Sequence, residues 1–363
     1  MTQLPRIAPP PCLAPGSPGP LRATGRPLRW GVVSTGAIAT LVSEDLTRLA
    51  DAVLQAVSSR NHANAVAFQR RFGFATAYFD GDAGAGYDQL FADPEVDVVY
   101  VATPHGQHYG IARRALEAGK HVLCEKSLTI NAREALELTE LAADRGLFLM
   151  EAVWTRFLPI INRAWEILAS GELGEVRWVQ ADLGFPAVYD PAARLWNPAA
   201  GGGALLDLGV YPLTWALGTL GFPQTVSATG LVNDDGVDAQ NAMTLSYGTG
   251  AQAQLACSLQ AASPRTATVA CTGGWLRSNA PLHHPTELTI EPHLGEARVE
   301  TFPTVGHGYV FELREVTRCI QAGLQQSPTM PWADTVDTMR LFDGVRAQLG
   351  VSYANDRAVP AAD

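Results

Sequence analysis

Short apolar runs alternate with helical segments along residues 28–150, and this rhythm constrains the fold more than any other feature. The run at 96–102 is almost entirely apolar, as is typical of a strand covered on both faces. Strands that alternate with helices at this spacing form a parallel, doubly wound sheet. The sequence predicts further strands at 28–34, 52–57, 121–124 and 147–150, and helices at 64–72, 108–118 and 132–145.

The rhythm changes after Glu151. Alternating apolar and polar residues then predict an antiparallel sheet with one open face. The fold class is therefore predicted as α/β, with a doubly wound parallel sheet at 29–150 followed by an α+β domain at 151–363. The second domain is expected to have strands at 177–183, 225–232, 242–247, 251–258 and 266–272, and helices at 160–169, 203–217, 308–321 and 332–348.

Residues 1–28 are rich in proline, which excludes a helix there. Two interpretations stay open. The segment is either a disordered leader or an extended arm that docks on the body or on a neighbouring subunit, because a polyproline segment loses little entropy on docking.

Composition excludes several classes of function. A formal net charge of -10 argues against a nucleic-acid or anionic-membrane partner. No apolar run reaches the about 18 residues of a membrane helix. The five cysteines have no CxxC spacing, so neither a disulfide framework nor a metal site is expected. A cytoplasmic location is expected, or a periplasmic one if a signal peptide has been removed.

The pair Glu125-Lys126 directly follows the apolar run of the strand at 121–124. The carboxyl edge of a doubly wound sheet is where ligands bind. A lysine at this edge can hold a hydroxyl or carbonyl oxygen while a hydride moves. Lys126 is therefore the predicted centre of the chemistry.

The turn after the first strand resembles a degenerate dinucleotide fingerprint. Gly36 keeps the position where the backbone approaches a pyrophosphate, and the next helix begins there. Ser34 replaces the first glycine of the usual pattern. The predicted residues of this turn are Ser34, Thr35, Gly36, Ala37 and Ile38.

Two further strand ends complete the predicted cofactor site. The second strand ends in Ser59-Arg60 rather than in an acidic residue, which suits the 2′-phosphate of NADP. The alternative is that Arg60 is a solvated loop residue. Thr103 and Pro104 are expected on the nicotinamide side, and His108 either near them or only at a helix start.

Asp207 and Tyr211 are four residues apart and share one face of the predicted helix. A carboxylate and a phenol are costly in an apolar core. A nearby ammonium such as Lys126 would lower the pKa of the tyrosine and make it an acid–base group. The alternative is a capping aspartate and an interface tyrosine.

Together these residues resemble the glucose–fructose oxidoreductase family of NAD(P)-dependent oxidoreductases, the Gfo/Idh/MocA type. The similarity is strongest to the branch with dimeric dihydrodiol dehydrogenase, NADP-dependent xylose dehydrogenase and the aldose–aldose oxidoreductases. The resemblance runs from about Leu28 to the C-terminus. The motifs that carry it are Glu125-Lys126, 102–108, 150–159 and 202–211.

The resemblance implies a Rossmann domain and a homodimer formed through the open sheet face. It implies Lys126 and Tyr211 as the catalytic pair, Asp207 as the carboxylate that orients the sugar, and Glu125 near the cofactor ribose. Glucose–fructose oxidoreductase and the aldose–aldose oxidoreductases carry a proline-rich N-terminal arm and retain NADP tightly, so the resemblance implies the same for residues 1–28.

Three more positions follow from the resemblance. Trp154 and Arg156 are implied beside the cofactor cleft. Ser127 stands where the family has proline, so Lys126 is expected to be aimed somewhat differently.

The leading hypothesis is an NADP-dependent oxidoreductase that oxidises a pyranose aldose at C1 to an aldonolactone, with a second sugar reoxidising the retained cofactor. An ordinary xylose or trans-dihydrodiol dehydrogenase with exchangeable NADP is the first alternative. A non-catalytic NADP-binding sensor is the second.

Overall fold

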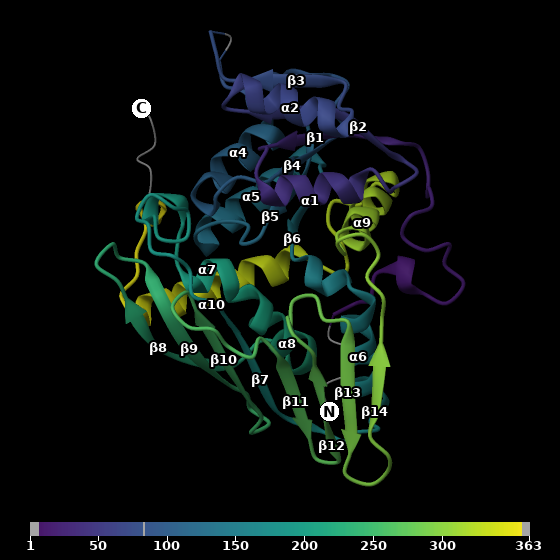
Figure 1. Ribbon diagram of the computed structural model, residues 1–363, viewed down its shortest axis with the longest axis vertical. Coiled ribbons are helices and arrows are strands. Elements are labelled where there is room, and N and C mark those ends of the chain that lie inside the picture. The colour runs from purple at the N-terminus through teal and green to yellow at the C-terminus, as the bar shows by residue number, and fades with distance from the viewer. Residues whose placement is uncertain (1–6, 83, 358–363) are drawn as a thin grey trace.

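The computed structural model describes residues 7–82 and 84–357. Its first layer is a six-stranded sheet of order β3-β2-β1-β4-β5-β6, in which every pair is parallel (Figure 1). The strands are β1 Leu28–Val33, β2 Ala52–Ser59, β3 Thr76–Phe79, β4 Val98–Val101, β5 His121–Glu125 and β6 Leu149–Ala152. The helices between them are α1 Ala37–Leu46, α2 His62–Phe72, α3 Gly86–Ala92, α4 His105–Glu117 and α5 Ala132–Arg145.

The second layer is an eight-stranded sheet of order β14-β13-β12-β11-β7-β10-β9-β8. Only β7 and β10 pair in parallel; the other neighbours are antiparallel. The predicted fold class is therefore confirmed. The strands are β7 Val176–Gly184, β8 Thr225–Val232, β9 Asp238–Ser246, β10 Gln252–Ser258, β11 Ala267–Cys271, β12 Gly274–Ser278, β13 Glu287–Pro292 and β14 Arg298–Thr301.

A layer of helices separates the two sheets and positions the site (Figure 1). Every residue of α8 is buried, which explains why its sequence is apolar all round. The predicted helix at 203–217 is two helices that meet at Gly209. This layer contains α6 Pro159–Ser170, α7 Ala204–Leu208, α8 Val210–Leu220 and α10 Trp332–Leu349, while α9 Val310–Gln321 packs beside α1.

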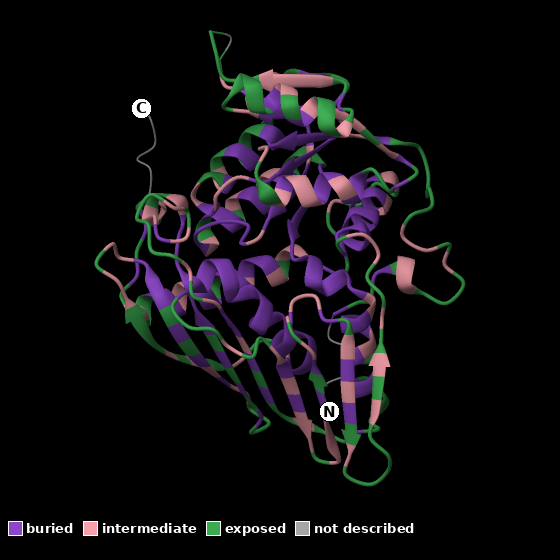
Figure 2. Cartoon of the chain, viewed as in Figure 1, coloured by how far each residue is buried: buried purple, intermediate pink, exposed green. Residues whose placement is uncertain are grey.

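The outer face of the eight-stranded sheet is open, as Figure 2 shows by its alternating stripes. Along β10, Gln252, Gln254 and Ala256 are exposed, while Ala253 and Leu255 between them are buried. The buried set packs toward the helical layer. This period of two is what the sequence pattern predicted for a sheet with one open face.

The proline-rich segment docks on the chain's own body along residues 7–27, and residues 1–6 lie outside the described part. The guanidinium of Arg314, on α9, donates to the Pro20 carbonyl oxygen at 2.7 Å. It also donates to both carboxylate oxygens of Asp51, in an ion pair whose two side chains are each 1% exposed. The Thr24 hydroxyl accepts from the same guanidinium.

Among the described residues, no helix combines the length and the apolar character that crossing a bilayer requires.

Candidate active site

A groove of about 990 Å³ lies at the carboxyl ends of β1, β2 and β4. This is the edge at which doubly wound sheets bind ligands. Of the residues predicted for the cofactor, it is lined by Ser34, Thr35, Gly36, Ser59, Arg60, Thr103 and Pro104.

The first turn of the groove leaves a helix start available to an anion. Gly36 is the N-cap of α1, and no side chain caps the helix. Ala37 and Ile38 form its first two residues, and uncapped amides at a helix start favour a phosphate. Ser34 has φ 109, a conformation that favours glycine. Its hydroxyl accepts a hydrogen bond from the Gly36 amide at 3.1 Å, which offsets part of the strain.

The groove also contains a hydroxyl pair and a cation. The Thr35 and Ser59 hydroxyl oxygens lie 3.2 Å apart. Arg60 is exposed and forms no ion pair with any described residue. Thr103 also lines the groove, and its buried Oγ1 has no hydrogen-bond partner within the described chain. A free cation, an uncapped helix and an orphaned hydroxyl in one groove fit a phosphorylated dinucleotide.

Lys126 and Asp207 meet where β5 ends against α7. The Lys126 ammonium donates to the main-chain oxygen of Asp207 at 2.6 Å and to its Oδ1 at 3.4 Å. Arg194 donates to the same Oδ1 at 2.8 Å. Burial opposes ionisation of Asp207, but the two cations outweigh it and hold its pKa well below the usual range. The site therefore contains a carboxylate that stays charged.

Tyr211 lies beside this pair. The Lys126 ammonium is 5.0 Å from the centroid of the phenol ring, and the Trp154 indole nitrogen donates to the Tyr211 hydroxyl at 3.3 Å. Burial raises the pKa of Tyr211, and the lowering by Lys126 and Trp154 does not offset it. Lys126 lowers the pKa of Tyr211, as expected, but burial outweighs this lowering, and the sequence pattern does not report how completely the phenol is buried.

Three side chains contact main-chain oxygens on or near the Lys126 segment. The His105 ring nitrogens lie 3.0 Å from the carbonyl oxygens of Lys126 and Gly201. The His108 ring lies between the carbonyl oxygens of Ser127 and Thr103, at 2.9 and 2.7 Å. The Ser127 hydroxyl donates to the Leu206 carbonyl at 3.1 Å.

Glu125 bonds to the adjacent strand rather than to α7. Its Oε1 accepts from the Tyr100 hydroxyl at 2.6 Å, and its Oε2 accepts from the Lys126 amide at 3.2 Å. Burial raises the pKa of Glu125 against the opposing charge of Lys126. Glu125 is not among the residues that line the groove.

Two further residues predicted for the cofactor, His108 and Arg156, do not line the groove either. His108 is fully buried on α4, which begins at His105, three residues before the predicted start. Its ring faces main-chain oxygens and does not line the groove. Arg156 is 1% exposed and donates to Asp334 at 2.6 Å.

The glycine run before α7 allows close approach of two segments. A Cβ at Gly201, whose φ is +70, would lie 2.5 Å from the Ile130 side chain and 2.8 Å from that of His105. At Gly203, with φ +118, it would lie 2.3 Å from Asp238 Oδ1. Only glycine permits this path of the chain toward Asp207.

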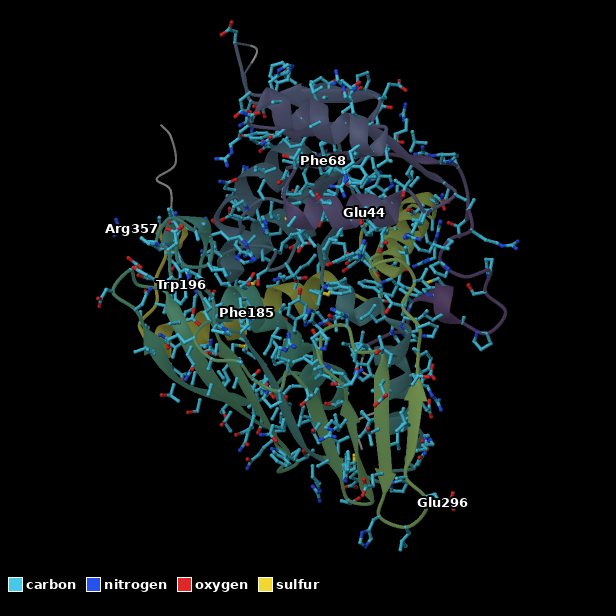
Figure 3. The ribbon with its side chains drawn as sticks, in the orientation of Figure 1. Glu44, Phe68, Phe185, Trp196, Glu296 and Arg357 are labelled. Atoms are coloured by element: carbon cyan, nitrogen blue, oxygen red, sulfur yellow. The ribbon has the colours of Figure 1, made fainter. Side chains whose placement is uncertain are left out.

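Arg194 was not predicted, and no local pattern indicates it. It lies on the loop after β7, which Phe185 and Trp196 mark in Figure 3. Main-chain hydrogen bonds from Gly202 and Gly203 to Asn197 and Leu195 bring this loop against the start of α7. His283 was also not predicted; it lies between β12 and β13, and neither strand was predicted from the sequence.

Comparison with known families identifies both halves of the chain. Residues 28–153 match "Oxidoreductase family, NAD-binding Rossmann fold", and residues 161–277 match "GFO/IDH/MocA C-terminal domain". The chain belongs to the GFO/IDH/MocA oxidoreductase family. The predicted family and the predicted enzyme class, an oxidoreductase with a nicotinamide-dinucleotide domain, are thereby confirmed.

Two relatives of this family cover nearly the whole chain. Trans-1,2-dihydrobenzene-1,2-diol dehydrogenase of Mus musculus is 35% identical over 342 residues, which is 91% of this chain and 99% of the relative. D-xylose 1-dehydrogenase (NADP(+)) of Hypocrea jecorina is 35% identical over 373 residues, covering 91% and 95%.

Solved structures of two other oxidoreductases share the fold. KijD10, a 3-ketoreductase from Actinomadura kijaniata in complex with NADP, superposes with a TM-score of 0.78 at 28% identity, over 89% of this chain and 98% of that one. The aldose–aldose oxidoreductase of Caulobacter crescentus gives a TM-score of 0.79 at 24% identity, over 92% and 99%. At that identity the likeness shows the fold alone.

Proposed function

We propose that this protein is an NADP-dependent dehydrogenase that oxidises the C1 hydroxyl of a pyranose aldose to an aldonolactone. The observation that carries the proposal is the ammonium–carboxylate–phenol group of Lys126, Asp207 and Tyr211, formed where β5 meets α7 and α8. The NADP-binding fungal relative and the unpaired Arg60 in the groove support NADP over NAD.

The oxidation removes one proton and one hydride from the C1 carbon and its hydroxyl. A bound nicotinamide supplies the hydride acceptor. The base form of Tyr211 accepts the hydroxyl proton. Lys126 stabilises that phenolate by its charge and hydrogen-bonds the substrate oxygen, while Asp207 accepts a hydrogen bond from the sugar.

Lys126 stays protonated during the reaction. Burial disfavours its ammonium, but Asp207 and then Tyr211 and Glu125 outweigh burial and raise its pKa. Tyr211 is different, because burial keeps its proton in place near neutral pH. Tyr211 is therefore a proton donor at neutral pH and becomes a proton acceptor at alkaline pH. Sugar oxidation, which needs the acceptor form, is favoured in alkaline solution.

A second candidate is a trans-dihydrodiol dehydrogenase, because the chain is as similar to the mouse dihydrodiol dehydrogenase as to the fungal xylose dehydrogenase. For both candidates, one observation favours an NADP that exchanges during turnover over one that is retained. The described part of the proline-rich arm contacts Asp51 and α9, and no residue of it lines the cofactor groove.

The experiment measures nucleotide and turnover in the same preparation. The purified protein is denatured and the supernatant is analysed for NADP(H), and the native protein is assayed with D-xylose, D-glucose and trans-1,2-dihydrobenzene-1,2-diol, each with NADP, with NAD and without added nucleotide. Turnover of an aldose with NADP supports the proposal.

The other outcomes separate the alternatives. Released NADP(H) with aldose-to-aldose turnover and no added nucleotide supports a ping-pong cycle with retained cofactor. Turnover of the diol alone moves the assignment to the second candidate. Nucleotide binding without oxidation of any of the three substrates refutes both and favours a sensor.

The open face of the eight-stranded sheet is proposed to join two copies of the chain. The small side chains of Ala242 and Ala256, paired across β9 and β10, are exposed there, and Trp178 on β7 is 38% exposed. Sedimentation of the wild type and of Ala256→Arg tests this: a dimer that becomes a monomer in the variant supports the interface, and a monomeric wild type refutes it.

A further inference from the structure

His283 lies against the phenol that we assign as the acid–base group. The His283 and Tyr211 ring centroids are 4.8 Å apart, with planes 34° apart. Trp154, which donates to the Tyr211 hydroxyl, meets the same imidazole edge-on at 5.9 Å. His283 thus borders the reacting atoms without belonging to the group formed by Lys126, Asp207 and Tyr211.

The main chain holds this imidazole in place. The hydroxyl of the buried Thr155 donates to the His283 carbonyl oxygen at 2.7 Å. The Trp215 indole, on α8, donates to the Leu282 carbonyl at 3.0 Å. Because α8 also carries Tyr211, the two rings are positioned by one rigid element, as a binding site requires.

The His283 ring has unused hydrogen-bonding capacity. Neither of its nitrogens has a hydrogen-bond partner among the residues that the structure describes, and only Nδ1 is fully buried. Burial, together with the charges of His284 and Lys126, lowers the pKa of His283 to about 3. The ring is therefore neutral and carries one N–H and one lone pair.

The other two histidines near Lys126 are placed differently. Both nitrogens of His105 and both nitrogens of His108 face main-chain carbonyl oxygens. Nε2 of His283 has no hydrogen-bond partner among the described residues and, unlike Nδ1, is not fully buried. It is therefore the ring atom that a ligand beside Tyr211 can reach.

We propose that His283 binds, through Nε2, the hydroxyl on the carbon adjacent to the one that is oxidised. Tyr211 takes the reacting hydroxyl, and the imidazole stacked beside it is placed for the next oxygen along the substrate. The inference rests on the proposed function and narrows its substrate class to vicinal diols. Aldoses at C1 and C2 and trans-dihydrodiols both satisfy this requirement, so one side chain accounts for both candidates.

The test compares the best aldose of the panel with its 2-deoxy counterpart, which lacks only the hydroxyl assigned to His283. In the wild type, kcat/KM is expected to favour the parent aldose by about tenfold, the size of one hydrogen bond between neutral groups. His283→Phe keeps a ring against Tyr211 but has no hydrogen-bonding atom. This variant should have a lower kcat/KM for the parent aldose and an unchanged kcat/KM for the 2-deoxy sugar. The ratio of the two kcat/KM values should therefore fall to about one. His283→Gln, which returns an amide near Nε2, should restore part of the preference.

His284→Phe is the matched control. The His284 ring contacts His283 and Trp154 but makes no ring contact with Tyr211 among the described residues, so the preference should stay at its wild-type value.

Two results overturn the inference. One is a wild type that turns over both sugars equally. The other is a His283→Phe variant that loses activity on both in parallel, which would make His283 a packing residue only. Failure of the proposed function gives a different result from these two, because the wild type then oxidises none of the alcohols. In that case the inference is refuted together with the proposed function.

Discussion

Replacing Lys126 by methionine separates the charge of this side chain from its length. The ammonium lies 3.4 Å from Asp207 Oδ1, and the two side chains are 11% and 9% exposed. Unit charges at this distance attract by about 5 kcal/mol at an effective dielectric constant of about 20. Arg194 stays on the same oxygen at 2.8 Å. We therefore expect Lys126→Met to lower the free energy of unfolding by about 3 kcal/mol, the lower end for a broken buried pair.

The catalytic loss should be separate from the loss of stability. Without the ammonium, only the hydrogen bond from Trp154 offsets the burial of a Tyr211 phenolate, so kcat/KM should fall about 100-fold or more. Urea unfolding gives the stability, steady-state kinetics on the folded protein gives kcat/KM, and fluorescence titration with NADPH confirms that the groove still binds.

Lys120, the residue directly before β5, provides a matched control. It is also largely buried, at 8% exposure, and its ammonium donates to the Asp93 and Val96 carbonyl oxygens at 2.7 and 2.8 Å. Lys120→Met should lose stability and keep kcat/KM within about threefold of the wild type. A Lys126→Met protein that retains kcat/KM within the same limit would refute the catalytic assignment, and an equal loss in Lys120→Met would assign the effect to folding.

Three further predictions concern other parts of the chain. Because burial raises the pKa of Tyr211, its acid form dominates at neutral pH, and the rate of oxidation should rise with pH above neutrality. In a pH–rate profile, Tyr211→Phe should remove that rise and lower kcat about 100-fold or more. Arg60→Ala should lower kcat/KM with NADP, but not with NAD, about tenfold or more, the size of a charge-assisted hydrogen bond, and equal losses with both would exclude a contact to the 2′-phosphate. Gly218→Ala places a Cβ 2.2 Å from the Trp165 ring and should cost about 1–3 kcal/mol in urea unfolding, whereas Gly344→Ala, which meets nothing within 4 Å, should be neutral or stabilising.

A strand is predicted from the sequence when its own residues carry a clear burial pattern. β4 is buried at every position, so an unbroken apolar run is enough to identify it. β3 and β14 have four residues each, and every residue in them is exposed or half-buried. Such short strands contribute little burial, and neither they nor β12, β13 and α3 were predicted from local pattern.

The same limit applies to the site. Lys126 follows a strand, and Asp207 and Tyr211 share a helical spacing, so local pattern identifies all three. Arg194 and His283 reach the site only because a loop and a sheet register bring them there. The sign of the Tyr211 pKa shift also depends on burial, which is a property of the assembled fold rather than of the residues beside it in sequence.

Ser127 stands where the family resemblance implies a proline, which raises the question of what orients Lys126. The Ser127 hydroxyl donates to the Leu206 carbonyl, and the Lys126 ammonium donates to the carbonyl of the next residue, Asp207. Two consecutive residues of the strand end thus bind two consecutive residues of α7. Proline could not make the first of these bonds. The direction of the ammonium is therefore set by α7 as well as by its own strand, and any motion that separates β5 from α7 would break both bonds and move Lys126 and Asp207 apart together.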